Sequence, residues 1–254
     1  YIGSKWGGKY LRAPDIFFKI LEKGKGKLVR LGDIAEVRRG FTTGANEFFY
    51  LKPTGQSAPK GLMHVRNSAG WEGFLEEEFL KPVIKSPREV KTICIRSEDL
   101  GYSLFMCHRS KQKLKKEGRI YAIEYIQWGE KQNYHQRPTC RTRQRWWDLG
   151  ERHPAKVNVN YLINDVAKGY IGSFFVSDDF QELHTNEQLA YFINSTLFWL
   201  VQNLFGRTSF GGGLLKIQTY EFKKLIIPYD ERLVHSLKNT FELLSTRPVK
   251  SAFE

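Results

Sequence analysis

The pattern of apolar and polar positions predicts helices and strands that follow one another without a regular rhythm. Short runs rich in β-branched and aromatic residues are predicted as strands, at residues 48–51, 92–96, 102–107, 170–176 and 225–227. Residues 28–37 fit either a strand or a short helix, and the stretch from 38 to 47 is a turn-rich loop. Because strands and helices do not alternate as βαβ units, the pattern favours an α+β fold.

Three helices are predicted. The first covers residues 14–21, ahead of a Gly/Lys linker. The second runs from an Asn186 N-cap to about residue 204, is apolar on nearly every side and stops at Gly206, so we expect a buried central helix surrounded by mixed or antiparallel strands. The third begins near Asp230 and lies on the surface or pairs with another helix. Its predicted apolar face comprises Leu233, Leu237, Phe241 and Leu244.

Composition narrows the class of partner. The 254 residues are 41% hydrophobic, which excludes a disordered chain, and 40 Lys and Arg against 27 Asp and Glu give a net charge of +13. Such an excess indicates a polyanionic partner, and an anionic membrane is disfavoured because no apolar run approaches about 18 residues. The three cysteines lack metal-ligand spacing, so we expect free thiols in a reducing compartment such as the cytoplasm, and no structural zinc.

The charge is unevenly distributed along the chain. Residues 1–66 carry +8 and residues 107–152 carry +7, whereas 67–106 carry −2 and 153–254 are neutral. We expect the two basic segments to meet on one nucleic-acid-facing side, with the neutral part serving as core and support.

The first candidate contact lies in the turn-rich loop. Arg38, Arg39, Thr42 and Thr43 offer two cations and two hydroxyls next to glycines that would let backbone N–H groups approach a phosphate. The alternative is that the glycines and threonines only form a tight turn. Asn46 fits either an adenine contact or a turn-stabilising bond, and the sequence does not choose between them.

The second candidate is an arginine-rich stretch that starts at Arg137. Arg141, Arg143 and Arg145 would share one face if the segment were extended, and forked donors suit guanine edges and phosphates. The alternative is ion pairing with acidic residues at 148 and 151. The adjacent Trp146 and Trp147 are expected in the core.

A third candidate follows the buried helix. Arg207 and Lys216 flank a glycine-rich loop and are expected to clamp phosphates, the alternative being a helix stop followed by a solvated linker.

Catalytic motifs of DNA enzymes are not evident. A base-flipping amino-methyltransferase needs a polar residue followed by Pro-Pro and an aromatic, and the nearest match is residues 227–229, with one proline. A Mg²⁺-dependent nuclease stays open as an alternative through the acidic-x-Lys tripeptides at 89–91 and 221–223. A nonspecific single-strand binder is another, and it would require Trp128, Trp146 and Trp147 to be exposed.

Several blocks, in order, resemble one family. They are residues 31–51, 79–88, 125–130, 137–149, 189–196, 206–216 and 224–228. Together they resemble the C-terminal target recognition domain of TaqI-like N6-adenine DNA methyltransferases and of the restriction-modification enzymes built on them. The resemblance implies sequence-specific binding of double-stranded DNA and adds Lys85, in the second block, to the expected DNA contacts.

The same resemblance implies that the chemistry lies in another part of the protein. An upstream methyltransferase domain of the same polypeptide would bind S-adenosylmethionine, and this chain itself would hold no cofactor, no metal and no catalytic residue. The chain begins with Tyr1 rather than Met, so we expect it to be part of a longer protein. Residues 1–27 would form the connector, 28–228 the DNA target recognition domain, and 229–254 a C-terminal helix and tail.

Overall fold

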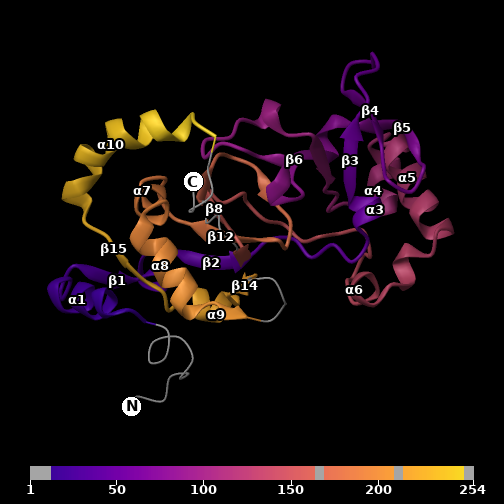
Figure 1. Cartoon of the computed structure of the whole chain (residues 1–254). Helices are drawn as coiled ribbons and strands as arrows, with labels where there is room; N and C mark the ends of the chain where they lie inside the picture. The colour runs from indigo at the N-terminus through magenta and orange to yellow at the C-terminus, as the bar shows by residue number, and fades with distance from the viewer. Residues whose placement is uncertain (1–12, 164–168, 209–213, 249–254) are drawn as a thin grey trace.

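The computed structural model describes residues 13–163, 169–208 and 214–248 (Figure 1). Its α-helices are α1 (Asp15–Lys23), α2 (Leu31–Ile34), α3 (Asn46–Phe49), α4 (Lys111–Lys116), α5 (Ile120–Lys131), α6 (Pro138–Arg141), α7 (Leu189–Ile193), α8 (Thr196–Phe205), α9 (Thr219–Phe222) and α10 (Glu231–Ser245). Short 3₁₀ turns cover Glu77–Phe79, Pro87–Glu89, Ser97–Asp99 and Tyr134–Gln136.

The larger sheet has six strands. In spatial order they are β11 (Phe175–Val176), β6 (Leu80–Ile84), β7 (Tyr102–Phe105), β3 (Tyr50–Pro53), β4 (Leu62–Arg66) and β5 (Glu72–Glu76). All neighbours are antiparallel except β11 and β6, which run parallel. The chain therefore returns to this sheet from a distant segment, and that return places residues 175–178 beside the turn-rich loop.

The second sheet has four antiparallel strands, in the order β10 (Gly169–Ile171), β8 (Val157–Asn160), β12 (Phe180–His184) and β2 (Glu36–Arg39). Its register sets Glu182 opposite Arg38 on one side and Asn158 on the other. Two small sheets complete the description, one of β1 (Leu28–Arg30) and β15 (Ile226–Pro228), the other of β13 (Arg207–Thr208), β14 (Leu215–Lys216) and β9 (Leu162–Ile163).

Two large hydrophobic clusters form most of the core. The first lies between the six-stranded sheet and helices α3 to α6, where the Phe48 ring stacks on Tyr125 with centroids 4.4 Å apart. The second lies between helices α1, α7, α8 and α10 and the four-stranded sheet. In Figure 1 these helices lie at one end of the molecule and α3 to α6 at the other, with β2, β8 and β12 between them.

The α+β class predicted from the pattern is confirmed. The helix predicted at 14–21 is α1, the strand at 102–107 is β7, the strand at 225–227 is β15, and the helix expected from Asp230 is α10. Residues 28–37 contain both alternatives, since β1 and α2 precede β2. Helix α10 packs on α7 through Phe241, whose ring centroid lies 4.5 Å from that of Tyr191. Leu233 and Leu244, which belong to its predicted apolar face, are exposed.

Two predicted strands need correction. Residues 48–51 begin as helix, because Phe48 and Phe49 donate their N–H groups back to the Ala45 carbonyl and α3 ends only at Phe49. Residues 92–96 form no strand; Cys94 makes an isolated bridge to Ile171 between two 3₁₀ turns.

The predicted long helix is interrupted. It divides into α7 and α8 at Asn194 and Ser195, since Asn194 exchanges hydrogen bonds with the backbone of Gly169 and the Ser195 hydroxyl caps α8 by accepting from Phe198 N–H. Such side-chain bonds to the backbone compete with helix continuation. Phe198, Val201 and Leu204 are buried in the second cluster, and Gly206 follows α8 as expected but has an extended backbone.

The predicted domain boundaries at 27 and 228 stay a prediction. Phe17, from the expected connector, and Phe241, from the expected C-terminal helix, both lie in the second cluster. Residues 1–12, 209–213 and 249–254, on which parts of those predictions fall, lie outside the described residues. Within the described ranges, no helix combines the length and apolar character needed to cross a membrane.

Candidate nucleic-acid interface

Residues 38–47, here called the basic loop, pack against a turn of the second sheet. Gly40 N–H donates to the Phe180 carbonyl at 3.1 Å, and Phe41 N–H donates to the Val176 carbonyl at 2.9 Å. A Cβ at Gly40 would lie 2.1 Å from the carbonyl oxygen of Ser177, so only glycine fits this close approach.

The second glycine of the loop serves contact with α6. Gly44 has φ +76°, and a Cβ there would lie 2.5 Å from the Cβ of Thr139. We expected these glycines to let a phosphate approach the loop. In the structure both positions instead allow close packing within the protein, which is the alternative that the sequence left open.

Arg143 clamps the basic loop to the arginine-rich stretch. Its Nη2 donates to the carbonyls of Thr42 and Thr43 at 2.9 and 2.8 Å, and its Nη1 donates to the Trp146 carbonyl at 3.2 Å. The guanidinium also lies over the Phe49 ring, 5.5 Å from its centroid. These contacts take up the forked donors that the sequence assigned to guanine or phosphate, so Arg143 positions the loop.

Arg137 makes a second link to the same loop. It donates to Glu47 Oε2 at 2.8 Å and to the Gly44 carbonyl at 3.5 Å, and it stacks over Tyr134 at 4.5 Å. Its side chain is still part of an open pocket of about 300 Å³. Thr42, Thr43, Gly44, Asn46, Glu47, Arg137 and Asp178 line this pocket.

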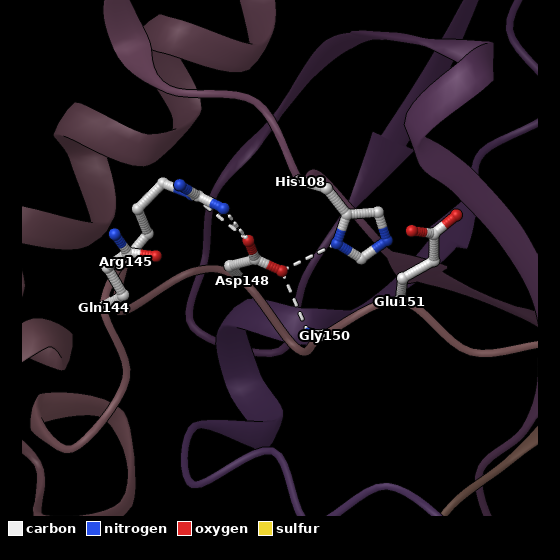
Figure 2. Close-up of a pocket in the computed structure, with 6 residues that line it drawn as sticks. All are labelled: His108, Gln144, Arg145, Asp148, Gly150 and Glu151. Atoms are coloured by element: carbon white, nitrogen blue, oxygen red, sulfur yellow. Dashed lines mark hydrogen bonds and ion pairs between the residues drawn. The ribbon is translucent and has the colours of Figure 1, made fainter.

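The predicted common face of three arginines is wrong. The stretch forms α6 and then a series of turns, so alternate residues do not point the same way. Arg143 turns inward, Arg145 pairs with Asp148 at 2.5 Å (Figure 2), and Arg141 is exposed with no side-chain partner within the described residues. The ion-pair alternative thus holds for Arg145, while Arg141 is exposed at the end of α6.

Polar side chains of the loop are also paired within the protein. Thr42 Oγ1 donates to Asp178 Oδ2 at 3.0 Å, and Thr43 Oγ1 donates to Asn46 Oδ1. Of the two roles open for Asn46, the structure shows the turn-stabilising bond. Asn46 is also one of the residues that line the open pocket.

The remaining predicted cations sit around aromatic rings or beside acids. Arg38 pairs with Glu36 at 2.7 Å, and Arg39 donates to the Asp178 carbonyl at 3.0 Å. Arg39 and Lys216 approach the same ring, that of Tyr161. The Arg39 guanidinium lies 4.2 Å and the Lys216 ammonium 5.4 Å from its centroid. Lys216 is thereby brought next to the basic loop, although it belongs to the part of the chain that was expected to serve as core and support.

Two other predicted contacts have partners of their own within the protein. Arg207 pairs with Glu221 at 2.6 Å and contacts the Tyr220 hydroxyl, so a carboxylate already holds the guanidinium. Lys85 lies over Tyr102, 4.9 Å from the ring centroid, and over Tyr50 at 5.6 Å.

Arg152 was not singled out by its sequence. It donates to the Arg39 carbonyl at 3.1 Å and lies over the Phe41 ring at 4.6 Å. Its other neighbour, Glu182 Oε2 at 3.9 Å, belongs to a side chain that is 1% exposed, and burial raises the pKa of Glu182 to about 7. The two basic segments do meet here, through Arg143 and Arg152.

Three observations concern the alternative functions, a single-strand binder and a Mg²⁺-dependent nuclease. Trp146 and Trp147 are buried in the first cluster, as expected, and Trp128 is partly buried there. Glu221 Oε2 accepts from Gln218 N–H while Oε1 pairs with Arg207. Among the residues that the structure describes, no group of three His, Cys, Asp or Glu side chains is placed to hold a metal ion.

A family model for the C-terminal domain of type II methyltransferase M.Eco57I matches residues 4–253. The chain belongs to this family of methyltransferase C-terminal domains. The family places the chain with type II restriction-modification proteins, as the sequence blocks predicted.

Two further similarities agree with this family. Type II methyltransferase M.AccI of Acinetobacter calcoaceticus is 27% identical over 164 residues, which cover 61% of this chain and 25% of that protein. The crystal structure of the type IIG restriction endonuclease BpuSI shares the fold, with a TM-score of 0.55 and 10% identity over 93% of this chain and 28% of that one. The chain thus spans about a quarter of the length of each.

Proposed function

We propose that this family member recognises a short double-stranded DNA sequence and positions a target adenine for a separate catalytic domain. The observation that carries the proposal is the joining of the two positively charged segments at one surface, where Arg143 and Arg152 tie residues 137–152 to the basic loop. Arg39 and Lys216 lie beside that junction around Tyr161, Arg141 is exposed in α6, and these side chains supply cations for phosphates.

In this proposal methyl transfer belongs to an S-adenosylmethionine-dependent domain elsewhere in the same polypeptide. The nearest match to a base-flipping motif supports that division. It lies in β15, where Ile227 is buried and pairs with Val29, so the segment is held in a sheet and cannot close over an extrahelical base.

The test uses the 254-residue chain and a library of randomised duplexes. We expect selection to enrich one short sequence, with binding that weakens steeply as salt rises. Arg141→Ala should lower affinity and reduce the salt slope by about 1. The matched control is Arg96→Ala, since Arg96 is also exposed but pairs with Glu98 in a separate turn.

Two results would contradict the proposal. One is binding without sequence preference, or no binding to any duplex. The other is transfer of a labelled methyl group by this chain alone, which would place the chemistry within the described fold.

A further inference from the structure

A pocket beside the basic loop contains a histidine fixed in one orientation. His108 follows β7, and its Nδ1 lies 2.6 Å from Asp148 Oδ1. Asp148 also accepts from Gly150 N–H at 2.9 Å and from Arg145. Figure 2 shows the Nδ1 edge of the ring turned to Asp148 and the opposite edge turned towards Glu151. The pocket has a volume of about 450 Å³.

The protonation of Asp148 determines the tautomer of His108. Burial opposes ionisation, but hydrogen bonds from His108, Gly150 and Arg145 hold the pKa of Asp148 below its ordinary value. An ionised carboxylate can only accept, so the His108 Nδ1 carries a proton and Nε2 is left for a ligand. When the ring is protonated, Nε2 becomes a donor on the edge that is turned towards Glu151.

The pocket continues into a second one that touches the basic loop. His108 and Glu151 line both, and the second, of about 360 Å³, adds Lys81, Arg109, Arg152 and His153. Its floor includes Phe175, whose ring lies 5.6 Å from Phe41 of the basic loop. Arg152 extends from this pocket to the Arg39 carbonyl, so the pocket and the loop share one edge.

The charges around His108 favour an anion. Glu78 accepts a hydrogen bond from Arg109 and forms an ion pair with Arg119, both at 2.6 Å, and Asp148 is satisfied as described. Lys81 has no side-chain partner within the described residues, and neither does Glu151, the one lining carboxylate left unpaired there. The neighbouring thiol of Cys107 stays neutral, since burial raises its pKa to about 11.

We propose that this pocket binds a backbone phosphate of DNA through His108 Nε2, with Arg152 and Lys81 beside it. The inference rests on the proposed function and extends the DNA contact beyond the basic loop, along the edge that Phe41 and Arg152 share. A phosphate contact requires the protonated ring, because a neutral ring with its proton on Nδ1 presents only an acceptor to an anion.

The experiment measures affinity for duplex DNA by fluorescence anisotropy, with wild type, His108→Gln and His153→Gln. We expect His108→Gln to bind about three- to tenfold more weakly than wild type, on selected and random duplexes alike. His153→Gln is a matched change at a residue that lines the second pocket, and it should follow wild type more closely.

A second variant tests the sign of the charge. Glu151→Gln removes the unpaired carboxylate without touching the His108 ring, and it should strengthen binding to the same duplexes about two- to fivefold. Inorganic phosphate, titrated while the His108 ring is followed by NMR, should compete weakly, whereas the duplex should shift the ring signals at much lower concentration.

The outcomes separate this inference from the proposed function. Unchanged affinity in His108→Gln, with wild type still selecting a DNA sequence, overturns the phosphate subsite and leaves the proposed function intact. Equal responses of the ring to inorganic phosphate and to duplex also overturn it. Failure of wild type to bind any duplex overturns both.

Discussion

The two basic stretches of residues 107–152 use their cations in opposite ways. In α4, Lys113, Lys115 and Lys116 are exposed and make no side-chain contact within the described residues. In the stretch from 137 to 152, most arginines bind carbonyls, carboxylates or rings of the protein itself. Charge density alone therefore does not identify a nucleic-acid contact, because the planar forked guanidinium is also the group best suited to fastening one loop to another.

Removing Arg143 gives the strongest test of the difference between these two stretches. Arg143→Ala removes the guanidinium that donates to the Thr42 and Thr43 carbonyls, and we expect the free energy of unfolding to fall by about 2 to 4 kcal/mol. Urea denaturation measures the loss. Arg143→Lys should restore little of it, since an ammonium cannot reproduce the fork.

The alternative role of Arg143 gives a distinct result. If Arg143→Ala kept its stability but lost sequence preference in DNA selection, Arg143 would read bases directly and the structural interpretation would be wrong. Arg141→Ala is the matched control, since its exposed side chain should leave the free energy of unfolding unchanged.

Arg143 and Arg152 differ in the kind of group that each faces. Arg143 meets carbonyls, whereas Arg152 faces Glu182, whose buried carboxyl has a pKa of about 7. Because this pKa is raised above that of the unfolded chain, stability from the protonated form is complete at low pH and is lost as the pH rises through about 7. Glu182→Gln mimics the protonated acid and should be as stable as wild type at pH 5. At pH 8 it should exceed wild type by on the order of 2 kcal/mol.

Thermal or urea unfolding between pH 5 and pH 8 tests this difference. Glu36→Gln is the control, because Glu36 is exposed on the neighbouring strand and should give no gain at high pH. A Glu182→Gln protein that is less stable than wild type at pH 8 would show instead that the ionised carboxylate stabilises the fold through Arg152.

Local patterns predicted much of the fold because burial repeats over a few residues. The periodicity was sufficient for α1, β7, β15 and α10, but α5 was not predicted, since buried Ala122, Tyr125, Ile126 and Gly129 stand among other aromatic residues. The break between α7 and α8 depends on a bond from Asn194 to Gly169, 25 residues away, which no local pattern contains.

The candidate site was less predictable for the same reason. The sequence identified the basic loop and the arginine-rich stretch, and it predicted that the two segments meet. It could not assign Arg143, because its partners are backbone carbonyls 100 and 101 residues away, and carbonyls occur at every position. The pairing of His108 with Asp148, 40 residues apart, likewise follows from tertiary packing.

The smallest expected effect concerns the lysines of α4. Replacing Lys113, Lys115 and Lys116 together by Gln removes three charges but no hydrogen bond or ion pair within the described residues, so the free energy of unfolding should change by less than about 0.5 kcal/mol.

The same exposed charges act on DNA mainly through long-range attraction, which salt screens over about 10 Å at 0.1 M. The triple variant should therefore bind the selected sequence more slowly at low salt and nearly as tightly as wild type near 0.15 M. Single Arg141→Ala should cost more affinity at that salt. If the triple variant instead lost more affinity than Arg141→Ala and lowered the salt slope by about 3, the lysines would contact phosphates and α4 would belong to the interface.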